Sequence, residues 1–94
     1  MKVTFNDKGL EELYKTSEGK WKRQFSKEVI THYQRKIEIL KNADDLGQIA
    51  KIKGLNLEKL KGKGYIGCYS IRVNEQYRII FRVSDKGTVA ILII

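Results

Sequence analysis

The sequence is poor in the residues that make disulfides, metal sites and membrane spans. Of its 94 residues none is proline, one is cysteine (Cys68) and one is histidine (His32). A single cysteine cannot form an internal disulfide, which is typical of a reducing compartment. With one histidine and no cysteine pair at metal-binding spacing, we expect neither a metal nor another cofactor.

Long apolar runs are also lacking. No stretch approaches the roughly 20 residues that a membrane span needs. The first residues, MKVTFNDKG, lack the long apolar segment of a signal peptide. The sequence therefore predicts a cytoplasmic protein that does not contact a membrane.

Carboxylates are scarce in the second half of the chain. The whole sequence contains 19 Lys and Arg against 11 Asp and Glu, which gives a net charge of +8. Residues 1–45 contain ten Lys and Arg against eight Asp and Glu, whereas residues 46–94 contain nine against three. This excess of cations predicts an anionic partner, with nucleic acid first, an acidic protein second and a membrane surface third. The plain alternative is that a small basic protein is simply soluble.

The first half of the chain has the hydrophobic spacing of helices. Its length and a hydrophobic content of 41% predict a single globular domain, 1–94. Residues 2–5 predict a short strand, and a short helix is expected to follow because apolar residues at 10, 13 and 14 share one helical face. A longer helix is expected from about Trp21 to Lys41, where apolar residues recur every three or four positions.

From Gly67 onward the hydrophobic period changes to two, the period of strands. Two alternating runs are followed by TVAILII (88–94), which predicts a strand buried on both faces. Short turns join the three strands, so we expect a C-terminal antiparallel meander. The predicted fold class is α+β, with a short N-terminal strand and two helices packed on one face of a small antiparallel sheet.

Alternation also fixes the register of the first hairpin in this meander. A two-residue loop would set core residues opposite solvent-facing ones, which a half-buried sheet resists. A three-residue loop, 74–76, aligns the apolar residues on one face and sets Arg72 opposite Arg78. Such loops usually contain one residue in the left-handed region; Asn74 tolerates that best, although the expected position is nearer Gln76.

Like charges directly opposite each other on a sheet are unfavourable, by some tenths of a kcal/mol to about 1 kcal/mol. The stability of the fold gives no reason for such a pair. Binding of a phosphate does, because a planar guanidinium group can bind two phosphate oxygens at once. Arg72, Arg78 and, farther along the same face, Arg82 therefore predict an anion site. The alternative is that these arginines lie over the sheet and pair with carboxylates, of which residues 46–94 contain three.

A single carboxylate stands inside the basic, glycine-rich stretch before this hairpin. Glu58 lies three residues before Lys61, and Lys63 follows. An ionised carboxylate can take a proton from a hydroxyl. Cations that hold a phosphodiester, together with one base, make a minimal RNA-cleaving site in which the ribose 2′-OH attacks the adjacent phosphorus without a metal. The alternative is that Glu58 is a surface salt-bridge partner.

Three stretches resemble one known family. FNDKGLEELY (5–14), LEKLKG (57–62) and GCYSIRVNEQYRIIFR (67–82) are similar to segments of HigB-type toxins of the RelE/ParE superfamily. The resemblance implies a RelE-like fold and a toxin of a bacterial type II toxin–antitoxin pair, which enters the ribosome and cleaves mRNA. It also implies a helix-turn-helix, HigA-like antitoxin that neutralises the toxin and provides its contact with DNA.

The resemblance implies a role for each candidate site residue. Glu58 stands where some family members have a catalytic histidine and the YoeB-type toxins a glutamate, so it is the expected general base. Arg78 matches the arginine that contacts the scissile phosphate and would stabilise the charge of the transition state. The expected RNA-binding residues are Lys61, Lys63, Arg72 and Arg82.

The C-terminus departs from the family pattern. Family members end with a tail of Tyr and His residues that supplies a general acid or a stacking ring, whereas this sequence ends at ILII (91–94). We therefore expect a truncated chain that retains the fold and the phosphate-binding arginines but has lost catalytic parts. The alternative functions are a ParE-like toxin that inhibits DNA gyrase by protein contact and a generic module that binds ribosomal RNA. LEKLKG and the opposed arginines favour the ribonuclease.

Overall fold

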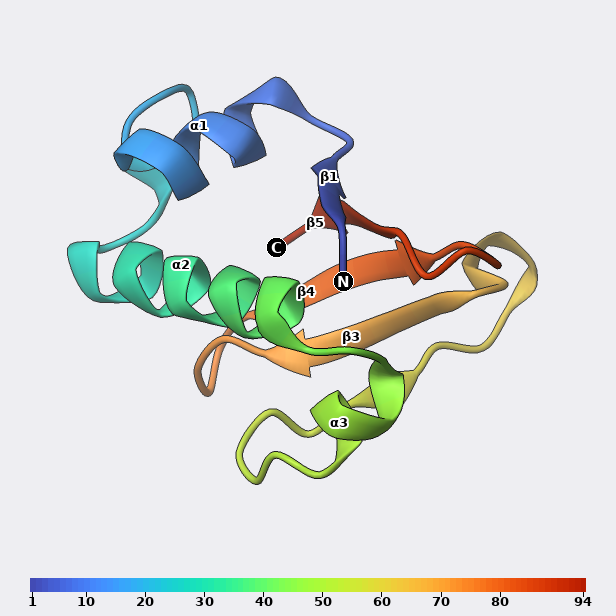
Figure 1. Cartoon of the computed structure of the whole chain (residues 1–94). Coiled ribbons are helices and arrows are strands. Elements are labelled where there is room, and N and C mark those ends of the chain that lie inside the picture. The colour runs from blue at the N-terminus through green and yellow to red at the C-terminus, as the bar shows by residue number, and fades with distance from the viewer.

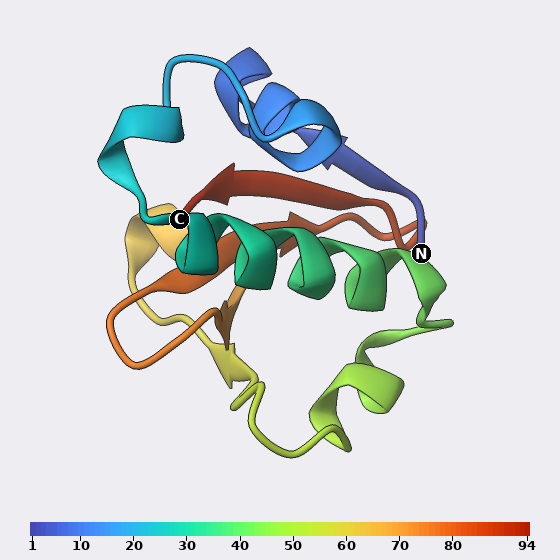
Figure 2. The same ribbon diagram turned by 90° about the vertical axis from the view of Figure 1, so that its left-hand side faces the viewer.

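The computed structural model describes all residues, 1–94, and contains one sheet with helices packed against it (Figure 1). The strands are β1 (Val3–Phe5), β2 (Glu58–Lys59), β3 (Cys68–Arg72), β4 (Arg78–Val83) and β5 (Val89–Ile93). The helices are α1 (Lys8–Thr16), α2 (Lys27–Asn42) and α3 (Leu46–Ala50), with short 3-10 turns η1 (Lys22–Gln24) and η2 (Lys63–Tyr65). The predicted α+β class is confirmed, and α1 and α2 lie on the same side of the sheet (Figure 2). None of these helices has the length and apolar composition to cross a membrane.

The strands are ordered β1-β5-β4-β3-β2 across the sheet. The C-terminal meander of β3, β4 and β5 is antiparallel, as predicted. β1 runs parallel to β5, with Val3 beside Val89 and Phe5 beside Ile91. The sheet is therefore mixed rather than antiparallel throughout, because the first strand of the chain pairs with the last.

The hairpin between β3 and β4 has the predicted register. Arg72 lies opposite Arg78, and Cys68 lies opposite Arg82. One face of the hairpin carries apolar residues that enter the core, as the alternation requires. The two arginines are consequently neighbours on the other face.

The loop of this hairpin differs from the expectation. Neither Asn74 nor Gln76 has a positive φ. Instead the Asn74 side-chain oxygen accepts hydrogen bonds from the backbone nitrogens of Gln76 (2.9 Å) and Tyr77 (2.8 Å). An asparagine side chain that binds the backbone in this way replaces part of the turn's own hydrogen bonding, so no left-handed residue is needed.

α2 begins at Lys27 rather than at about Trp21. Ser26 is its N-cap, and the Ser26 hydroxyl accepts a hydrogen bond from the backbone nitrogen of Val29 at 3.2 Å. Phe25 before it is extended. A serine cap favours the start of a helix at the next residue because its hydroxyl satisfies a free backbone donor of the first turn. The predicted start was therefore too early.

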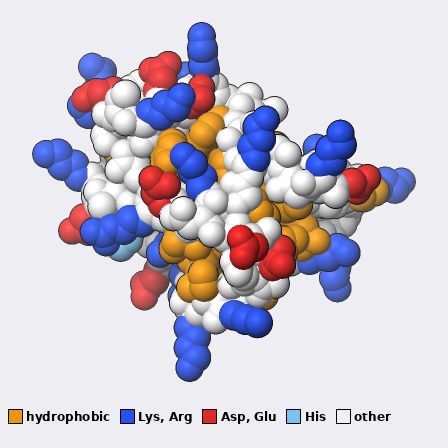
Figure 3. All heavy atoms as spheres, in the orientation of Figure 1, with side chains coloured by type: hydrophobic (Ala, Val, Ile, Leu, Met, Phe, Trp, Pro, Cys, Tyr) orange, Lys and Arg blue, Asp and Glu red, His pale blue; other side chains and the backbone are white.

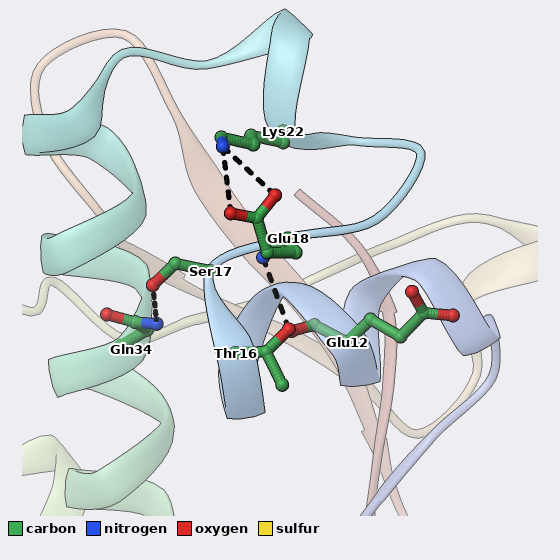
Figure 4. Close-up of polar contacts among 6 residues, drawn as sticks. All are labelled: Glu12, Thr16, Ser17, Glu18, Lys22 and Gln34. Atoms are coloured by element: carbon green, nitrogen blue, oxygen red, sulfur yellow. Dashed lines mark hydrogen bonds and ion pairs between the residues drawn. The ribbon is translucent and has the colours of Figure 1, made fainter.

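Polar contacts tie the loop after α1 to α2 (Figure 4). Gln34 of α2 donates from its amide to the Ser17 hydroxyl at 2.7 Å and to the carbonyl oxygens of Leu13 and Tyr14 at 3.0 and 3.2 Å. These carbonyls belong to the last turn of α1. The Leu13 oxygen also accepts from the backbone nitrogen of Ser17 at 3.2 Å, whereas the Tyr14 oxygen has no helical partner. Gln34 therefore fixes the position of α1 against α2.

The core lies between these two helices and the sheet. Tyr33 of α2 is fully buried, and its hydroxyl donates to the carbonyl oxygen of Leu10 at 2.8 Å. Burial raises the pKa of Tyr33, so its hydroxyl keeps the proton that it donates. In β5, Val89 and Ile91 are fully buried, whereas Ala90 and Leu92 are only partly buried. A register shift pairs Ile93 with Ile80 on the face away from the helices, and Ile93 is 55% exposed. The expected burial of this strand on both faces is therefore wrong, because helices cover only one face of the sheet.

Candidate functional site

The predicted site residues of the sheet lie on the face opposite α1 and α2. Arg72 and Arg78 are register partners, and Arg82 follows on the same side of β4 because side chains alternate along a strand. Glu58 lies opposite Ser70 on the edge strand β2, so its side chain stands on this face too. Three neighbouring strands therefore contribute to one surface.

Arg78 is held by hydrogen bonds to its neighbours. Its Nε donates to the Ser70 hydroxyl at 2.9 Å, and its Nη2 donates to the backbone oxygens of Ser70 (3.3 Å) and Asn56. Nη2 also lies 3.8 Å from Glu58 Oε1, and 30% of the Arg78 side chain is exposed. One edge of the guanidinium group is thus occupied, while Nη1 makes no hydrogen bond within the protein.

The backbone before β2 is shaped to reach Arg78. Asn56 has a φ of 47°, in the left-handed region that asparagine tolerates better than most residues. The preceding residue, Leu55, is buried, and its carbonyl oxygen accepts a hydrogen bond from the backbone nitrogen of Arg72 at 2.7 Å. This segment is therefore anchored against β3, which brings the Asn56 carbonyl to the guanidinium group.

Arg72 and Arg82 differ from Arg78 because both are exposed. Four ion pairs occur in the structure, and neither Arg72 nor Arg82 takes part in one. Arg82 donates instead to the backbone oxygen of Gly64 at 3.3 Å. On the helix side of the molecule, by contrast, carboxylates stand among the cations (Figure 3). The two exposed arginines therefore retain charge that an anion can neutralise.

Lys61 and Lys63 are exposed on the segment that joins β2 to β3. Hydrogen bonds at its two ends, from Leu60 N to Cys68 O and from Val83 N to Gly67 O, attach this segment beside the Arg82 end of β4. Four residues of strand, roughly 13 Å, separate Arg82 from Arg78. The six predicted residues therefore form two groups: Glu58, Arg72 and Arg78 in one, and Lys61, Lys63 and Arg82 in the other.

Sequence reasoning missed the two residues that hold Arg78. Ser70 is diagonal to Arg78 in the predicted register, and diagonal neighbours on one face are within reach of a long side chain. The Ser70 contact could therefore have been predicted from the sequence. The Asn56 contact could not, because it uses a backbone carbonyl whose direction depends on the loop. Ser70 lies between Arg72 and Cys68 on this face and is only 2% exposed, and Cys68, the partner of Arg82, is fully buried. This face is therefore exposed at Arg72 and Arg82 and buried between them.

The comparisons with known proteins agree with this fold. Residues 3–93 match the family model of HigB-like toxins, described as the RelE-like toxin of the type II toxin–antitoxin system HigB. Toxin HigB-1 of Vibrio cholerae serotype O1 is 36% identical over 85 residues, which cover 90% of this chain and 86% of that protein.

Two solved structures illustrate the likeness. A heterotetrameric YoeB–YefM toxin–antitoxin complex from Staphylococcus aureus contains a chain that is 27% identical, with a TM-score of 0.58 over 98% of this chain and 91% of that one. The YoeB/ParE toxin from Agrobacterium tumefaciens has a TM-score of 0.62 over 98% of this chain and 93% of its own, and at 18% identity it shows the fold alone. With the family match over nearly the whole length, the chain belongs to the HigB family, the RelE-like toxins of type II toxin–antitoxin systems.

Proposed function

We propose that this toxin is a ribosome-dependent mRNA endoribonuclease that cleaves by attack of a ribose 2′-OH on the adjacent phosphorus, with no metal. The observation that carries the proposal is the approach of Glu58 Oε1 to within 3.8 Å of Arg78 Nη2. In-line attack needs a base for the 2′-OH proton and a cation beside the phosphoryl oxygens. The pair supplies both on one face of the sheet.

Each residue of this pair has a distinct task in the proposed reaction. Glu58 takes the 2′-OH proton, and the new bond from the 2′ oxygen to phosphorus yields a 2′,3′-cyclic phosphate while the 5′ oxygen leaves. Negative charge on the phosphoryl oxygens grows in the transition state, and Arg78 binds it through Nη1. Since Nε and Nη2 are engaged with Ser70 and Asn56, Arg78 offers a single contact. The opposed Arg72 provides a second cation for the same phosphate.

The departing 5′ oxygen also needs a proton. Solvent supplies it in the proposed reaction, because this face is exposed at Arg72 and Arg82. Lys61, Lys63 and Arg82 bind the RNA backbone to one side of the scissile phosphate in this proposal.

The proposed partners follow from the same role. The ribosome presents the mRNA, which places the toxin in the cytoplasm. The cognate antitoxin is a helix-turn-helix, HigA-like protein, through which the pair would contact DNA. The Staphylococcus aureus relative, which was solved as a toxin–antitoxin complex, supports an antitoxin partner.

Mapping of mRNA ends tests the proposed cleavage. The protein, added to ribosomes programmed with a defined mRNA, should produce codon-phased cuts with 5′-hydroxyl ends. Arg78→Ala should slow cleavage by about 10²- to 10³-fold, as removal of one donor to a developing oxyanion does, and Glu58→Gln should slow it by about 10²- to 10⁴-fold. Arg35→Ala, an exposed arginine of α2, is the matched control and should cleave normally.

Two results would contradict the proposal. Cleavage that survives Arg78→Ala would remove the Glu58–Arg78 pair from the reaction. Intact mRNA together with DNA damage in expressing cells would favour the alternative, a ParE-like toxin that inhibits gyrase by protein contact.

A further inference from the structure

Tyr65 and Ile66 form an exposed apolar tip on the segment between β2 and β3, here named the Tyr65–Ile66 tip. Tyr65 is 47% exposed, and Ile66 is 79% exposed, more than any other large hydrophobic residue of the chain. Neither residue belongs to the core cluster or packs against it. Single exposed hydrophobic residues are ordinary, but two adjacent ones on a polar, glycine-rich segment indicate a contact surface.

The tip is held in place by its own turn. Tyr65 ends η2, and its backbone nitrogen donates to the Gly62 carbonyl at 3.1 Å. Gly62 has a φ of 112°, and a Cβ there would lie 3.5 Å from the Tyr65 ring, so the ring folds back over this glycine. Gly67, with a φ of 76°, turns the chain into β3. Both ends of the segment are attached to the sheet, so the ring is already positioned before any partner arrives.

Cations without carboxylate partners surround the tip. Lys61 and Lys63 are exposed neighbours in the sequence, and neither takes part in an ion pair. Arg82 donates to the Gly64 carbonyl at 3.3 Å, which sets its guanidinium group against the same turn. An aromatic ring among unpaired cations has the composition of a site that stacks a nucleobase and binds the phosphates on either side of it.

We propose that the Tyr65–Ile66 tip is a base-stacking subsite for single-stranded RNA, beside Arg82 at the other end of β4 from the Glu58–Arg78 pair. The inference rests on the proposed ribonuclease function and adds a second point of contact with the same strand. Every base has a π face, so stacking at Tyr65 tolerates any base. The subsite therefore positions the strand without reading its sequence, and Ile66 extends the apolar surface beneath the base.

A protein partner would also cover an apolar tip, but the charges favour RNA. Three cations lie on or beside this segment, Lys61, Lys63 and Arg82, while the nearest carboxylate in the sequence, Glu58, is engaged with Arg78. A stacked nucleotide brings one apolar face and at least one phosphate, which matches both features of the tip. A protein contact is an outcome of the experiment below.

Fluorescence anisotropy with a short single-stranded oligoribonucleotide, measured over a NaCl series, tests the subsite. Tyr65→Ala should weaken binding by roughly 5- to 100-fold, the range found for loss of one stacked base. The slope of log K against log salt should not change, since the ring releases no counterions. Tyr65→Phe should bind like the unmodified protein. Lys63→Ala should reduce the slope by about one unit, and Ile52→Ala, an apolar residue that is 40% exposed elsewhere, should change nothing.

An abasic site moved along the oligoribonucleotide separates stacking from indirect effects. It should weaken binding of the unmodified protein at one position and binding of Tyr65→Ala at none. Unchanged affinity in Tyr65→Ala, or equal sensitivity of both proteins to the abasic site, would overturn the inference. If Tyr65→Ala binds and cleaves RNA normally but loses antitoxin binding, the tip is a protein contact and the proposed function stands. If the unmodified protein binds no single-stranded RNA even at low salt, the inference fails. The proposed function is decided separately, by cleavage of mRNA on programmed ribosomes.

Discussion

A single side chain, Arg78, is given its role by the atoms around it. Arg72 and Arg78 are opposite each other in register, yet their surroundings differ. Arg78 donates to Ser70 and Asn56, whereas Arg72 is exposed and has no carboxylate partner. A guanidinium group that is already oriented loses little freedom when it meets a phosphate. Arg78 is therefore suited to a fixed contact with the reacting group, and Arg72 to a more adaptable contact with the backbone.

A double-mutant cycle tests this orientation. Ser70→Ala and Arg78→Ala should be coupled by about 1 kcal/mol of unfolding free energy, because each removes the same hydrogen bond to a charged group. Relief of the repulsion between Arg78 and Arg72 occurs in both arms of the cycle and cancels. The measurement is urea unfolding of the four proteins. Ser70→Ala with Arg72→Ala should show no coupling. A coupling energy of zero between Ser70→Ala and Arg78→Ala would mean that the hydrogen bond from Arg78 Nε to Ser70 Oγ does not form in solution.

Among the elements, the β3–β4 hairpin has the most influence on the site, because its register sets the arginines opposite each other. The loop keeps this register through the Asn74 side chain, which accepts two backbone hydrogen bonds. The register itself was predictable from alternation, since a slip of one residue would expose the core face. The loop conformation was not, because a side-chain acceptor and a left-handed residue are two solutions to the same turn.

Substitutions at Asn74 distinguish these two solutions. Asn74→Ala should lower the free energy of unfolding by about 1 kcal/mol, since two backbone donors lose their acceptor. Asn74→Asp keeps the acceptor and should be nearly neutral. Asn74→Gly should be at least as destabilising as Asn74→Ala, whereas a loop that needed a left-handed residue would be stabilised by it. Midpoints of urea unfolding measure all three.

The sequence predicted features that depend on residues within one segment better than features that depend on distant segments. Periodicity placed both main helices and the meander, because hydrophobic spacing is written within each segment. The start of α2 was placed too early because Trp21 and Phe25 continue the helical spacing, although Ser26 is a capping residue. The parallel pairing of β1 with β5 had no signal in the three residues of β1. In the site, alternation predicted that Arg72 faces Arg78. The approach of Glu58 depends on the pairing of β2 with β3, and the Asn56 contact depends on a loop whose path no spacing rule gives.

At the scale of the whole molecule, the charge is as informative as the fold. A net charge of +8 on 94 residues works against a compact state through self-repulsion. The exposed arginines on the sheet face, Arg72 and Arg82, have no carboxylate partners to offset it. An anionic partner would therefore stabilise the protein as well as occupy its site.

Thermal unfolding at increasing NaCl concentration tests this self-repulsion. Tm should rise as ionic strength increases to about 0.15 M, because the Debye length then falls to about 8 Å. Arg72→Glu replaces a like-charge pair with an opposite-charge pair, so it should raise Tm at low salt and reduce the salt dependence. A Tm that falls with added salt would show that favourable ion pairs outweigh the repulsion.

The pairing of β1 with β5 also governs when the fold can form. The first strand to be synthesised finds its neighbour only in the last one, so a growing chain carries an unfinished sheet until β5 has emerged. A contact that spans nearly the whole sequence is slow to close. For a protein proposed to attack translating ribosomes, this order of events postpones activity until β5 has left the ribosome that is making it.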